Sequence, residues 1–393
     1  MAQPHRAGIK SVFVRRLFEF PTPFGAENSE SYDYKKVQMS QVILGDVFVA
    51  DNGKKLGFGI IGCGVIADFH ANALFELSGD ADLLGVADVN YDAAEKFANR
   101  HRIRPYPDVP ALLADKAVDV VCICTPSGYH ADVVRQAAEA GKHIVVEKPM
   151  AITKAQLDDI VACCETNGVM LTSIAQSRFS RSVVRTKNAV DEGLLGRIVT
   201  ADIYMKYFRS QEYYDSGSWR GTKRLDGGGA LMNQGIHGVD LLLHLAGPVS
   251  RVYARAKTLA RKIEVEDTLS AVVDFESGAI GVIQATTSVY PGYPRRLEIN
   301  GEKGSIALEE NSIAKWDIYS GSHEDIVVQP AAFSSASTPT AISLDGHTRQ
   351  IADMIRAVKT GTRPTIDVYE GRKPVDLILA IYRSAEEGRP IDL

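Results

Sequence analysis

The sequence has few cysteines, no long apolar run and no excess of positive charge. Its five cysteines are odd in number and fall in predicted strands and helices and in a glycine loop, so we expect reduced thiols and a cytoplasmic location. No apolar run approaches the roughly 18 residues of a membrane span. The N-terminus also lacks an apolar segment followed by a small-residue cleavage site. These absences argue against a disulfide framework and against a membrane partner.

The charge is balanced, with a net value of -5 at pH 7 and no long block of Lys or Arg. A nucleic-acid-binding protein would show a basic patch or arm, so no nucleic-acid partner is expected. The chain has 393 residues, of which 45% are hydrophobic and 24% charged, as in an ordinary globular protein with room for two domains. A small molecule is therefore the expected partner.

Residues 1–55 differ from the rest, because turn-forming residues alternate there with short apolar stretches that hold no clear period. Four basic residues precede the first acidic residue, Glu19, which is also a feature of transit peptides. A mis-assigned start or a partner-facing arm explains the composition better. We treat residues 1–55 as an N-terminal extension of unknown role.

From Leu56 onward, short apolar runs alternate with segments of helical periodicity, which is the pattern of βαβ units. One helix is predicted from a capping box, Thr153 with Gln156, to Gly168. The pattern predicts a Rossmann domain with a doubly wound parallel sheet over residues 56–177. Its predicted strands are Gly57–Ile61, Leu83–Ala87, Val118–Cys124, His143–Val146 and Val169–Ile174.

After about Arg178 the pattern changes to alternating strands joined by hairpin turns, such as 276–278 and 300–301. Residues 178–393 are therefore expected to form a substrate-binding and oligomerisation domain, an open and largely antiparallel sheet with helices. A helix is expected to end at Gly193–Gly196. The predicted strands are Ile198–Tyr207, Val252–Ala256, Thr268–Phe275 and Ile280–Thr286, and the predicted final helices are Thr348–Lys359 and Val375–Glu387.

A dinucleotide fingerprint, Gly62-Cys63-Gly64-Val65-Ile66-Ala67, follows the first strand directly. Gly62 permits the tight turn, Gly64 lets a pyrophosphate approach the backbone, and Ala67 lets the helix pack on the sheet. The alternative is a glycine turn without a ligand. The strand before the loop, the helix after it and an acid at the end of the second strand all favour cofactor binding.

That acid is Asp88, which follows the strand Leu83–Ala87. A carboxylate there accepts hydrogen bonds from the adenosine ribose and repels a 2′-phosphate, so NAD is favoured over NADP. Asp88 or Asn90 could also cap the helix that starts near Tyr91, and the two roles are compatible.

Several further motifs complete a recognisable set. The first half contains Thr125–His130 and Gly141–Pro149, and the second half contains Gln176–Phe179, Trp219–Thr222 and Gly227–Asp240. Together with the glycine loop, they resemble the Gfo/Idh/MocA family of glucose-fructose oxidoreductases and inositol dehydrogenases, over roughly Leu56 to the C-terminus. The resemblance implies a Rossmann domain followed by an open antiparallel sheet whose free face often builds homodimers or homotetramers.

The resemblance makes Lys148 and His237 the catalytic residues. Lys148 follows the strand His143–Val146 at the carboxyl edge of the parallel sheet, where such folds bind ligands. A lysine there can stabilise the negative charge that develops on the substrate oxygen during hydride transfer. Family members often have the bond to the following proline in the cis form, which Pro149 permits. His237 would take or return the hydroxyl proton.

Residues 230–246 are predicted to form a helix, so that Asn233 and His237 share one face and Asp240 follows one turn later. A histidine with a spaced acid could bind a metal ion, but no third well-placed ligand accompanies it, and no metal site is expected. The family commonly has Asp where this chain has Asn233. An amide binds a hydroxyl but takes no proton, so Asn233 is predicted to position the substrate.

The remaining site predictions also follow from the resemblance. The expected substrate-binding residues are Asn233, Arg209, Tyr213, Tyr214 and Asp240. The expected cofactor-binding residues are Gly62, Gly64, Val65, Ile66, Ala67, Asp88, Thr125, Pro126, His130, Glu147, Lys148, Gln176, Trp219 and Arg220.

The favoured function is an NAD-dependent dehydrogenase of a sugar, a sugar derivative or a cyclic polyol. The version of the helix motif in this chain is most similar to sugar 3-dehydrogenases, so C3 of a pyranoside is a candidate position. An NAD-retaining enzyme that cleaves glycosides by oxidation, elimination and reduction is the second possibility, and a non-catalytic NAD-binding regulator is the third. The presence of both Lys148 and His237 argues against the regulator.

Overall fold

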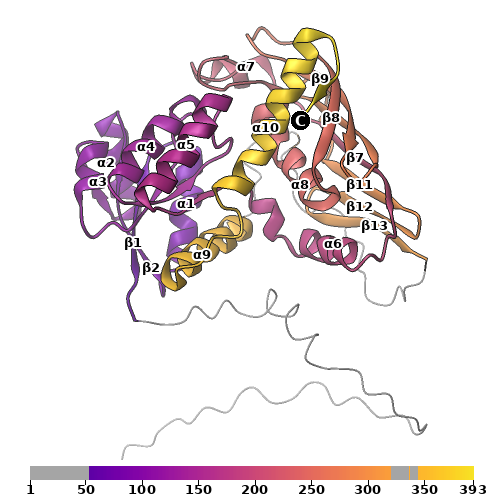
Figure 1. Cartoon of the computed structure of the whole chain (residues 1–393). Coiled ribbons are helices and arrows are strands. Elements are labelled where there is room, and N and C mark those ends of the chain that lie inside the picture. The colour runs from indigo at the N-terminus through magenta and orange to yellow at the C-terminus, as the bar shows by residue number, and fades with distance from the viewer. Residues whose placement is uncertain (1–52, 320–335, 337–343) are drawn as a thin grey trace, which may run out of the picture. The chain divides into compact units, whose positions relative to one another are not determined.

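The computed structural model describes residues 53–319, 336 and 344–393. The predicted extension therefore lies outside the described residues except for its last three positions, 53–55. The described chain contains two sheets, which Figure 1 shows on either side of the long C-terminal helices. No helix among these residues is long and apolar enough to cross a membrane.

The first sheet has six parallel strands in the order β3-β2-β1-β4-β5-β6, so the predicted doubly wound fold is confirmed. All residues of β1 and β4 are buried, as expected for strands covered on both faces. The strands are β1 (Leu56–Ile61), β2 (Ala81–Ala87), β3 (Arg104–Pro105), β4 (Val120–Ile123), β5 (His143–Val146) and β6 (Leu171–Ser173).

Helices on both faces of this sheet begin and end where their capping residues place them. Thr153 Oγ1 accepts a hydrogen bond from the Gln156 N–H at 3.2 Å, and Gly168 ends the same helix in the left-handed conformation, as predicted. The helices are α1 (Val65–Glu76), α2 (Tyr91–His101), α3 (Val109–Ala114), α4 (His130–Glu139) and α5 (Lys154–Asn167), with short 3-10 turns at η2 (Ser127–Tyr129) and η3 (Gln176–Phe179).

The second sheet has eight strands in the order β13-β12-β11-β7-β10-β9-β8-β14. Neighbouring strands are antiparallel except β7 and β10, which run parallel, so the predicted largely antiparallel sheet is confirmed. The strands are β7 (Ile198–Lys206), β8 (Val249–Lys257), β9 (Thr268–Phe275), β10 (Ile280–Thr286), β11 (Arg296–Gly301), β12 (Gly304–Glu309), β13 (Ser312–Ile318) and β14 (Ile391–Asp392).

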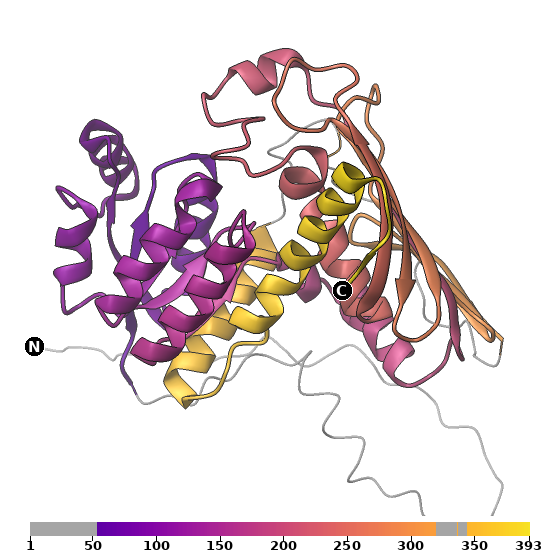
Figure 2. The same ribbon diagram turned by 45° about the horizontal axis from the view of Figure 1, so that its top comes forward.

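Figures 1 and 2 show helices against one face of this sheet and strands alone on the other. The helices of this half are α6 (Arg181–Asp191), α7 (Gln211–Asp215), α8 (Ile236–Ala246) and α10 (Val368–Glu387). Helix α10 starts at Val368, earlier than the predicted Val375, because Asp367 caps it there. Pro374 therefore lies inside the helix and not before it. Leu377, Ile378 and Ile381 are fully buried, so packing compensates for the hydrogen bond that a proline cannot make.

Helix α9 (Leu344–Thr360) belongs to the second half of the sequence but packs on the Rossmann helix α1. Its Ile351 and Ile355 join the core that contains Phe58 of β1. Lys359 Nζ lies 2.6 Å from Asp80 Oδ1 at the end of this contact. The return of the chain to its first sheet ties the two halves together, which no local pattern in the sequence indicates.

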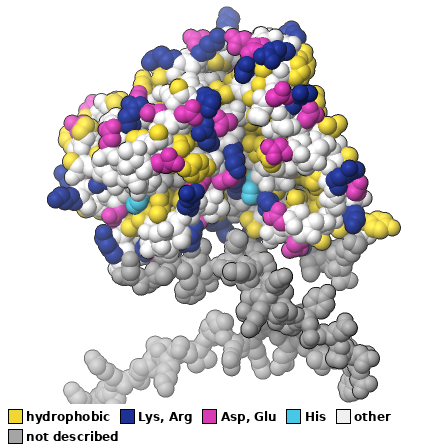
Figure 3. Space-filling view, viewed as in Figure 1, with side chains coloured by type: hydrophobic (Ala, Val, Ile, Leu, Met, Phe, Trp, Pro, Cys, Tyr) yellow, Lys and Arg dark blue, Asp and Glu magenta, His cyan; other side chains and the backbone are white. Residues whose placement is uncertain are grey.

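On the face that Figure 3 shows, acidic and basic side chains are interspersed. This agrees with the balanced charge of the sequence.

Candidate active site

A cavity of about 1400 Å³ lies between the carboxyl edge of the Rossmann sheet and the start of α8. Two sides of this cavity matter for function. Its Rossmann side is formed by Gly62, Cys63, Gly64, Val65, Ile66, Asp88, Thr125, Pro126, Glu147, Lys148 and Gln176. Its other side is formed by Tyr207, Arg209, Tyr213, Trp219, Arg220, Asn233, Gln234, His237, Arg295, Glu310, Asn311 and Ser312.

The glycine loop has the geometry that a dinucleotide requires. Gly62 has a φ of 98°, and a Cβ there would lie 2.8 Å from the Cys124 backbone. At Gly64, in contrast, a Cβ would meet nothing within 4 Å, so the backbone faces open space at the N-terminus of α1. Ala67 is fully buried between α1 and the sheet. The loop thus leaves room for a pyrophosphate at a helix N-terminus.

Asp88 lies at the end of β2 and lines the cavity. Its Oδ2 accepts a hydrogen bond from the Cys63 N–H at 2.8 Å, and its Oδ1 accepts one from the Asn90 N–H at 2.9 Å. The cap of α2 is Asn90, whose side chain accepts from the Ala93 N–H at 3.4 Å. Asp88 is therefore hydrogen-bonded to the glycine loop, and Asn90 caps α2.

Two polar atoms on the Rossmann side, Thr125 Oγ1 and Gln176 Oε1, are buried without a hydrogen-bond partner among the described residues. Buried polar groups are normally satisfied, so unsatisfied ones at a cavity wall fit a site built for a ligand. Together with the open glycine loop, they fit a bound dinucleotide.

Lys148 follows β5, and the bond from Lys148 to Pro149 is cis. Its Nζ donates a hydrogen bond to the Asn233 backbone oxygen at 3.0 Å, which joins the Rossmann edge to the turn before α8. Burial lowers the pKa of Lys148, while the charges of Glu147 and Asp226 oppose this effect. The ammonium therefore stands at the cavity wall with little water around it.

The prediction of one continuous helix over residues 230–246 has to be corrected at its start. Residues Ala230–Gly235 form a π-helical turn, η4, and the α-helix begins only at Ile236. The buried Glu266 carboxylate explains the turn, because it accepts hydrogen bonds from the Gly229 and Leu231 N–H groups at 2.9 and 3.0 Å. Asn233 and His237 thus lie on different kinds of turn, although both line the cavity.

His237 is half-buried at the first turn of α8. Its pKa lies well below the usual value, first because of burial and then because Lys148 and Arg295 bring positive charge close to it. The imidazole is therefore neutral at pH 7, the form that can accept a proton.

Asp226, which no sequence motif indicated, supplies the carboxylate that the motif lacks at position 233. Its Oδ1 accepts a hydrogen bond from Asn233 Nδ2 at 2.5 Å, and its Oδ2 accepts one from the Gly221 N–H at 2.8 Å. Burial raises the pKa of Asp226 to about 6. The position of Asp226 just before the three glycines 227–229 was the only available signal.

A second group that the sequence analysis missed surrounds Glu147. Its Oε1 lies 2.8 Å from His70 Nε2 and 3.7 Å from His347 Nε2 of α9. Burial alone would raise the pKa of Glu147, but the two imidazoles hold it well below the usual value. These three side chains are close enough to share a metal ion. The absence of a metal site stays a prediction. Elemental analysis of the purified protein would show whether these three side chains bind a metal ion.

The aromatic and arginine residues of the predicted site cluster around Tyr213. Arg220 Nη1 donates a hydrogen bond to the Tyr213 hydroxyl at 2.6 Å, and its guanidinium carbon lies 4.4 Å from the Tyr213 ring centre and 4.6 Å from that of Trp219. Arg209 Nη1 donates to the Phe208 and Ala336 carbonyl oxygens. The structure thus brings these predicted residues to one wall of the cavity.

Besides Ala67, which is buried between α1 and the sheet, three predicted site residues do not line the main cavity and are corrected. Tyr214 is buried, and its hydroxyl lies 2.8 Å from Thr287 Oγ1. His130 is buried with its ring nitrogens 2.8 and 2.9 Å from the Pro149 and Thr125 carbonyl oxygens, so it holds the two loops that line the cofactor side. Both residues support the site from behind.

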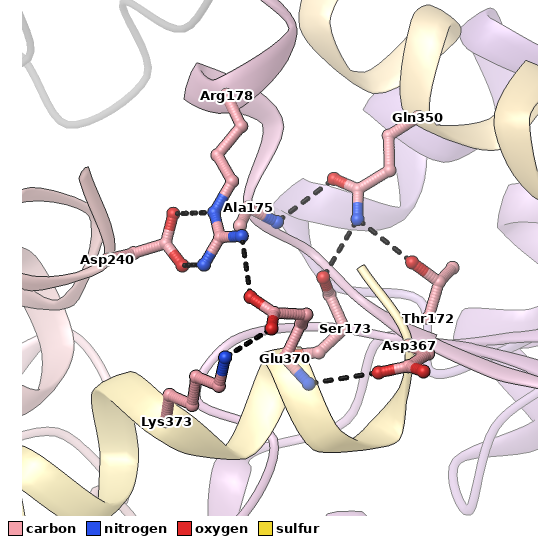
Figure 4. A network of polar contacts seen from close by, with 9 residues as sticks. All are labelled: Thr172, Ser173, Ala175, Arg178, Asp240, Gln350, Asp367, Glu370 and Lys373. Atoms are coloured by element: carbon pink, nitrogen blue, oxygen red, sulfur yellow. Dashed lines mark hydrogen bonds and ion pairs between the residues drawn. The ribbon is translucent and has the colours of Figure 1, made fainter. Parts of the chain in front are cut away.

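Asp240 is the third correction. Arg178 takes up both of its carboxylate oxygens, at 2.9 Å from Nε and 2.7 Å from Nη2, as Figure 4 shows. Arg178 also donates to Glu370 Oε2 of α10 at 3.1 Å. Asp240 therefore belongs to a buried ion-pair network in which Arg178 joins α8 to α10, and both of its carboxylate oxygens already accept hydrogen bonds.

Two family profiles match this chain. The profile described as "Oxidoreductase family, NAD-binding Rossmann fold" matches residues 56–174, and the one described as "GFO/IDH/MocA C-terminal domain" matches residues 183–307. The chain belongs to the Gfo/Idh/MocA family. The resemblance that the motifs carried is thereby confirmed.

Relatives within this family act on sugars and polyols. The myo-inositol 2-dehydrogenase of Thermotoga maritima is 27% identical over 353 residues, which are 85% of this chain and 98% of the relative. The inositol 2-dehydrogenase of Rhizobium meliloti is 27% identical over 344 residues, 86% of this chain and 98% of the relative.

Among solved structures, the WlbA dehydrogenase from Bordetella pertussis in complex with NADH and UDP-GlcNAcA is 35% identical. The match covers 87% of this chain and 98% of WlbA, with a TM-score of 0.81. This Gfo/Idh/MocA protein is accordingly an NAD-binding oxidoreductase, and the inositol dehydrogenases above are its relatives.

Proposed function

We propose that Lys148 and His237 act together on one hydroxyl group of a sugar ring. The observation that carries this proposal is the hydrogen bond from Lys148 Nζ to the Asn233 backbone oxygen, on the turn that leads into the helix presenting His237. Both side chains line the same cavity, beside the glycine loop. Two groups of different chemistry thus meet where a cofactor and a sugar would face each other.

Oxidation of a hydroxyl group removes a proton from oxygen and a hydride from carbon. NAD, when bound, accepts the hydride. Neutral His237 accepts the hydroxyl proton, and the Lys148 ammonium donates a hydrogen bond to the same oxygen while negative charge develops on it. The lowered pKa of His237 keeps it in the neutral form that this direction requires. In the reverse direction, the imidazolium returns the proton.

The substrate we propose is a pyranoside or nucleotide-linked sugar oxidised at C3. The cavity of about 1400 Å³ exceeds the roughly 300–1,000 Å³ of an ordinary ligand pocket, so it has room for a cofactor and a sugar together. The likeness to WlbA, whose structure contains UDP-GlcNAcA, supports a sugar nucleotide. NAD is proposed over NADP because Asp88 stands at the end of β2.

We also propose that the protein is a homodimer or homotetramer through the free face of the eight-stranded sheet. Tyr253 of β8 and Val272 of β9 are paired neighbours on this sheet and are 41% and 53% exposed. Val282 of β10 pairs with Val272, and Ile280, two residues before it on the same strand, is 54% exposed. Contiguous exposed apolar side chains are typical of an interface.

The cytoplasmic location stays a prediction.

A panel of hexoses, inositols, uronates, glycosides and nucleotide sugars, scored for NADH absorbance, tests the function. Net NADH from a free or nucleotide-linked sugar is expected. Cleavage of a glycoside without net NADH would favour the oxidation, elimination and reduction cycle instead. Binding of NADH without turnover of any compound would contradict the proposed dehydrogenase.

A further inference from the structure

Arg295 stands out on the wall opposite the cofactor loop. It precedes β11, its side chain is only 5% exposed, and it lines the cavity. A buried guanidinium costs free energy unless partners satisfy it. No motif of the sequence analysis included this residue, and neither catalytic nor cofactor contacts account for it.

The partners of Arg295 hold it in place without neutralising it closely. Its Nη2 donates hydrogen bonds to the Glu310 backbone oxygen at 3.0 Å and to Asn311 Oδ1 at 2.8 Å, both in the turn between β12 and β13. The Glu310 carboxylate accepts instead from the Arg295 backbone N–H at 3.1 Å, and its other oxygen lies 4.0 Å from Nη2. Nε is buried with no hydrogen-bond partner among the described residues.

Arg295 also lies beside the proposed reaction centre. Its Cδ would be 3.3 Å from a Cβ added at Gly238, so the side chain packs on the turn of α8 that presents His237. Its positive charge also helps to lower the pKa of His237, after burial and the charge of Lys148. A positioned, desolvated guanidinium at a cavity wall has the donor geometry and charge that bind a carboxylate or a phosphate.

We infer that Arg295 binds an anionic substituent of the substrate, a carboxylate or a phosphate on the sugar ring, and so selects acidic sugars over neutral ones. This inference rests on the proposed function and names its substrate class. A guanidinium discriminates by charge and by its fixed donor geometry. The hydroxymethyl group of a neutral sugar would leave Arg295 with only the Glu310 carboxylate nearby among the described residues, at 4.0 Å from Nη2 and without a close charge-assisted hydrogen bond.

Calorimetric binding to the NADH-loaded protein tests the inference, with UDP-glucuronate beside UDP-glucose and with glucuronate and glucose 6-phosphate beside glucose. Each acidic compound differs from its neutral partner only in the group in question. We expect at least one acidic member to bind about tenfold or more tightly than its neutral partner, as for a charge-assisted hydrogen bond. Tighter binding of the glucuronates would identify the bound group as a carboxylate, and tighter binding of glucose 6-phosphate would identify it as a phosphate.

Variants then assign the preference to this residue. Arg295→Met should remove the difference by weakening the acidic member alone, and Arg295→Lys should retain part of it. Arg296→Met is the matched control, because Arg296 pairs with Glu298 at the partly exposed start of β11 and does not line the cavity. Unchanged NADH affinity in each variant shows that the fold is intact.

Equal binding of acidic and neutral members by the unaltered protein would overturn the inference, and so would absence of binding by all five compounds. A loss in Arg295→Met that affects both members equally would do the same. NADH formation is measured separately. Acid-selective binding without any turnover would keep the role of Arg295 and reject the proposed oxidation.

Discussion

At the scale of single residues, the site contains a carboxylate that its motif does not. Asn233 replaces the family's common Asp, yet its amide donates to Asp226, which lies in the cluster with Lys148. The negative charge is therefore kept near the lysine but is carried by a different residue. This changes what a substitution at position 233 would do, since Asn233→Asp would set two carboxylates against each other.

Asp226→Asn should move the alkaline limb of the pH–rate profile. Asp226, with a pKa of about 6, is charged at neutral pH and favours the ammonium form of Lys148. Its removal should lower the pKa of Lys148. Because the oxidation needs the ammonium, activity should be lost at lower pH, by something on the order of one unit. An alkaline limb that stays in place, in initial rates of sugar oxidation at constant salt, would separate Asp226 from Lys148.

Lys148→Ala and His237→Ala should each lower turnover by at least about 10²-fold, because each removes a group that acts on the transferring proton or its oxygen. NAD affinity, measured by fluorescence, should stay within a few-fold. Lys154→Ala is the control, since Lys154 is exposed and, within the described part of the chain, its ion pair is with Asp158 one helical turn away. Near-normal turnover in either active-site variant would remove that residue from the mechanism.

At the scale of elements, the π turn before α8 depends on a residue far away in sequence. Gly229 is packed so closely that a Cβ would lie 1.7 Å from the Glu266 backbone oxygen. The same Glu266 side chain holds the N–H groups of Gly229 and Leu231. The shape of the turn that carries Asn233 is thus set by the connection between β8 and β9.

Gly229→Ala should therefore lower the free energy of unfolding by about 1–3 kcal/mol, the usual cost of overpacking. Turnover should fall as well, because the turn carries the oxygen that receives Lys148 Nζ. Gly79→Ala is a fair comparison, since a Cβ there would meet nothing within 4 Å. Chemical denaturation of both variants checks this, and equal stability would show that the turn relaxes without cost.

The end of β2 and the glycine loop together determine whether the protein prefers NAD or NADP. Asp88 is tied to the loop through the Cys63 N–H, so its carboxylate has a fixed place. Asp88→Ser should relax the preference for NAD over NADP, because the repulsion of a 2′-phosphate is lost. Direct binding of NADH and NADPH measures this without substrate. A protein that already prefers NADPH would contradict the assignment.

At the scale of the whole described molecule, Arg178 connects its parts. It lies in η3 and binds Asp240 of α8 and Glu370 of α10, while Gln350 of α9 donates to Thr172 and Ser173 next to it, as Figure 4 shows. A buried pair contributes little by itself, but loss of one partner leaves a buried charge. Arg178 and Gln350 thus add polar links between the Rossmann half and the C-terminal helices to the packing of α9 on α1.

Arg178→Met should lower the free energy of unfolding by about 3–5 kcal/mol, because Asp240 would stay buried without its partner. Arg197→Met, which removes an exposed pair with Glu302, should cost at most about 1 kcal/mol. Denaturation at pH 7 compares the two. If Arg178→Met and Arg197→Met cost the same, water must reach Asp240, and the pair does not hold the halves together.

The sequence by itself determined the fold class, the family and the cofactor loop, because these depend on local patterns. Buried parallel strands read as apolar runs, the Gly62–Ala67 fingerprint requires its own backbone geometry, and the Glu147-Lys148-Pro149 motif marks a strand end. Capping residues such as Thr153 and Gly168 likewise act on their own helix. Each of these signals lies within a few neighbouring residues.

Only the tertiary structure decided which polar residues face the cavity. Tyr214, His130 and Asp240 carry motif positions but satisfy buried partners elsewhere. Arg295 lines the cavity from another segment, and Asp226 and His347 contact the lining residues Asn233 and Glu147. The physical reason is that a buried polar side chain must find its partner in space. That partner is fixed by packing between distant segments, which one-dimensional spacing does not encode.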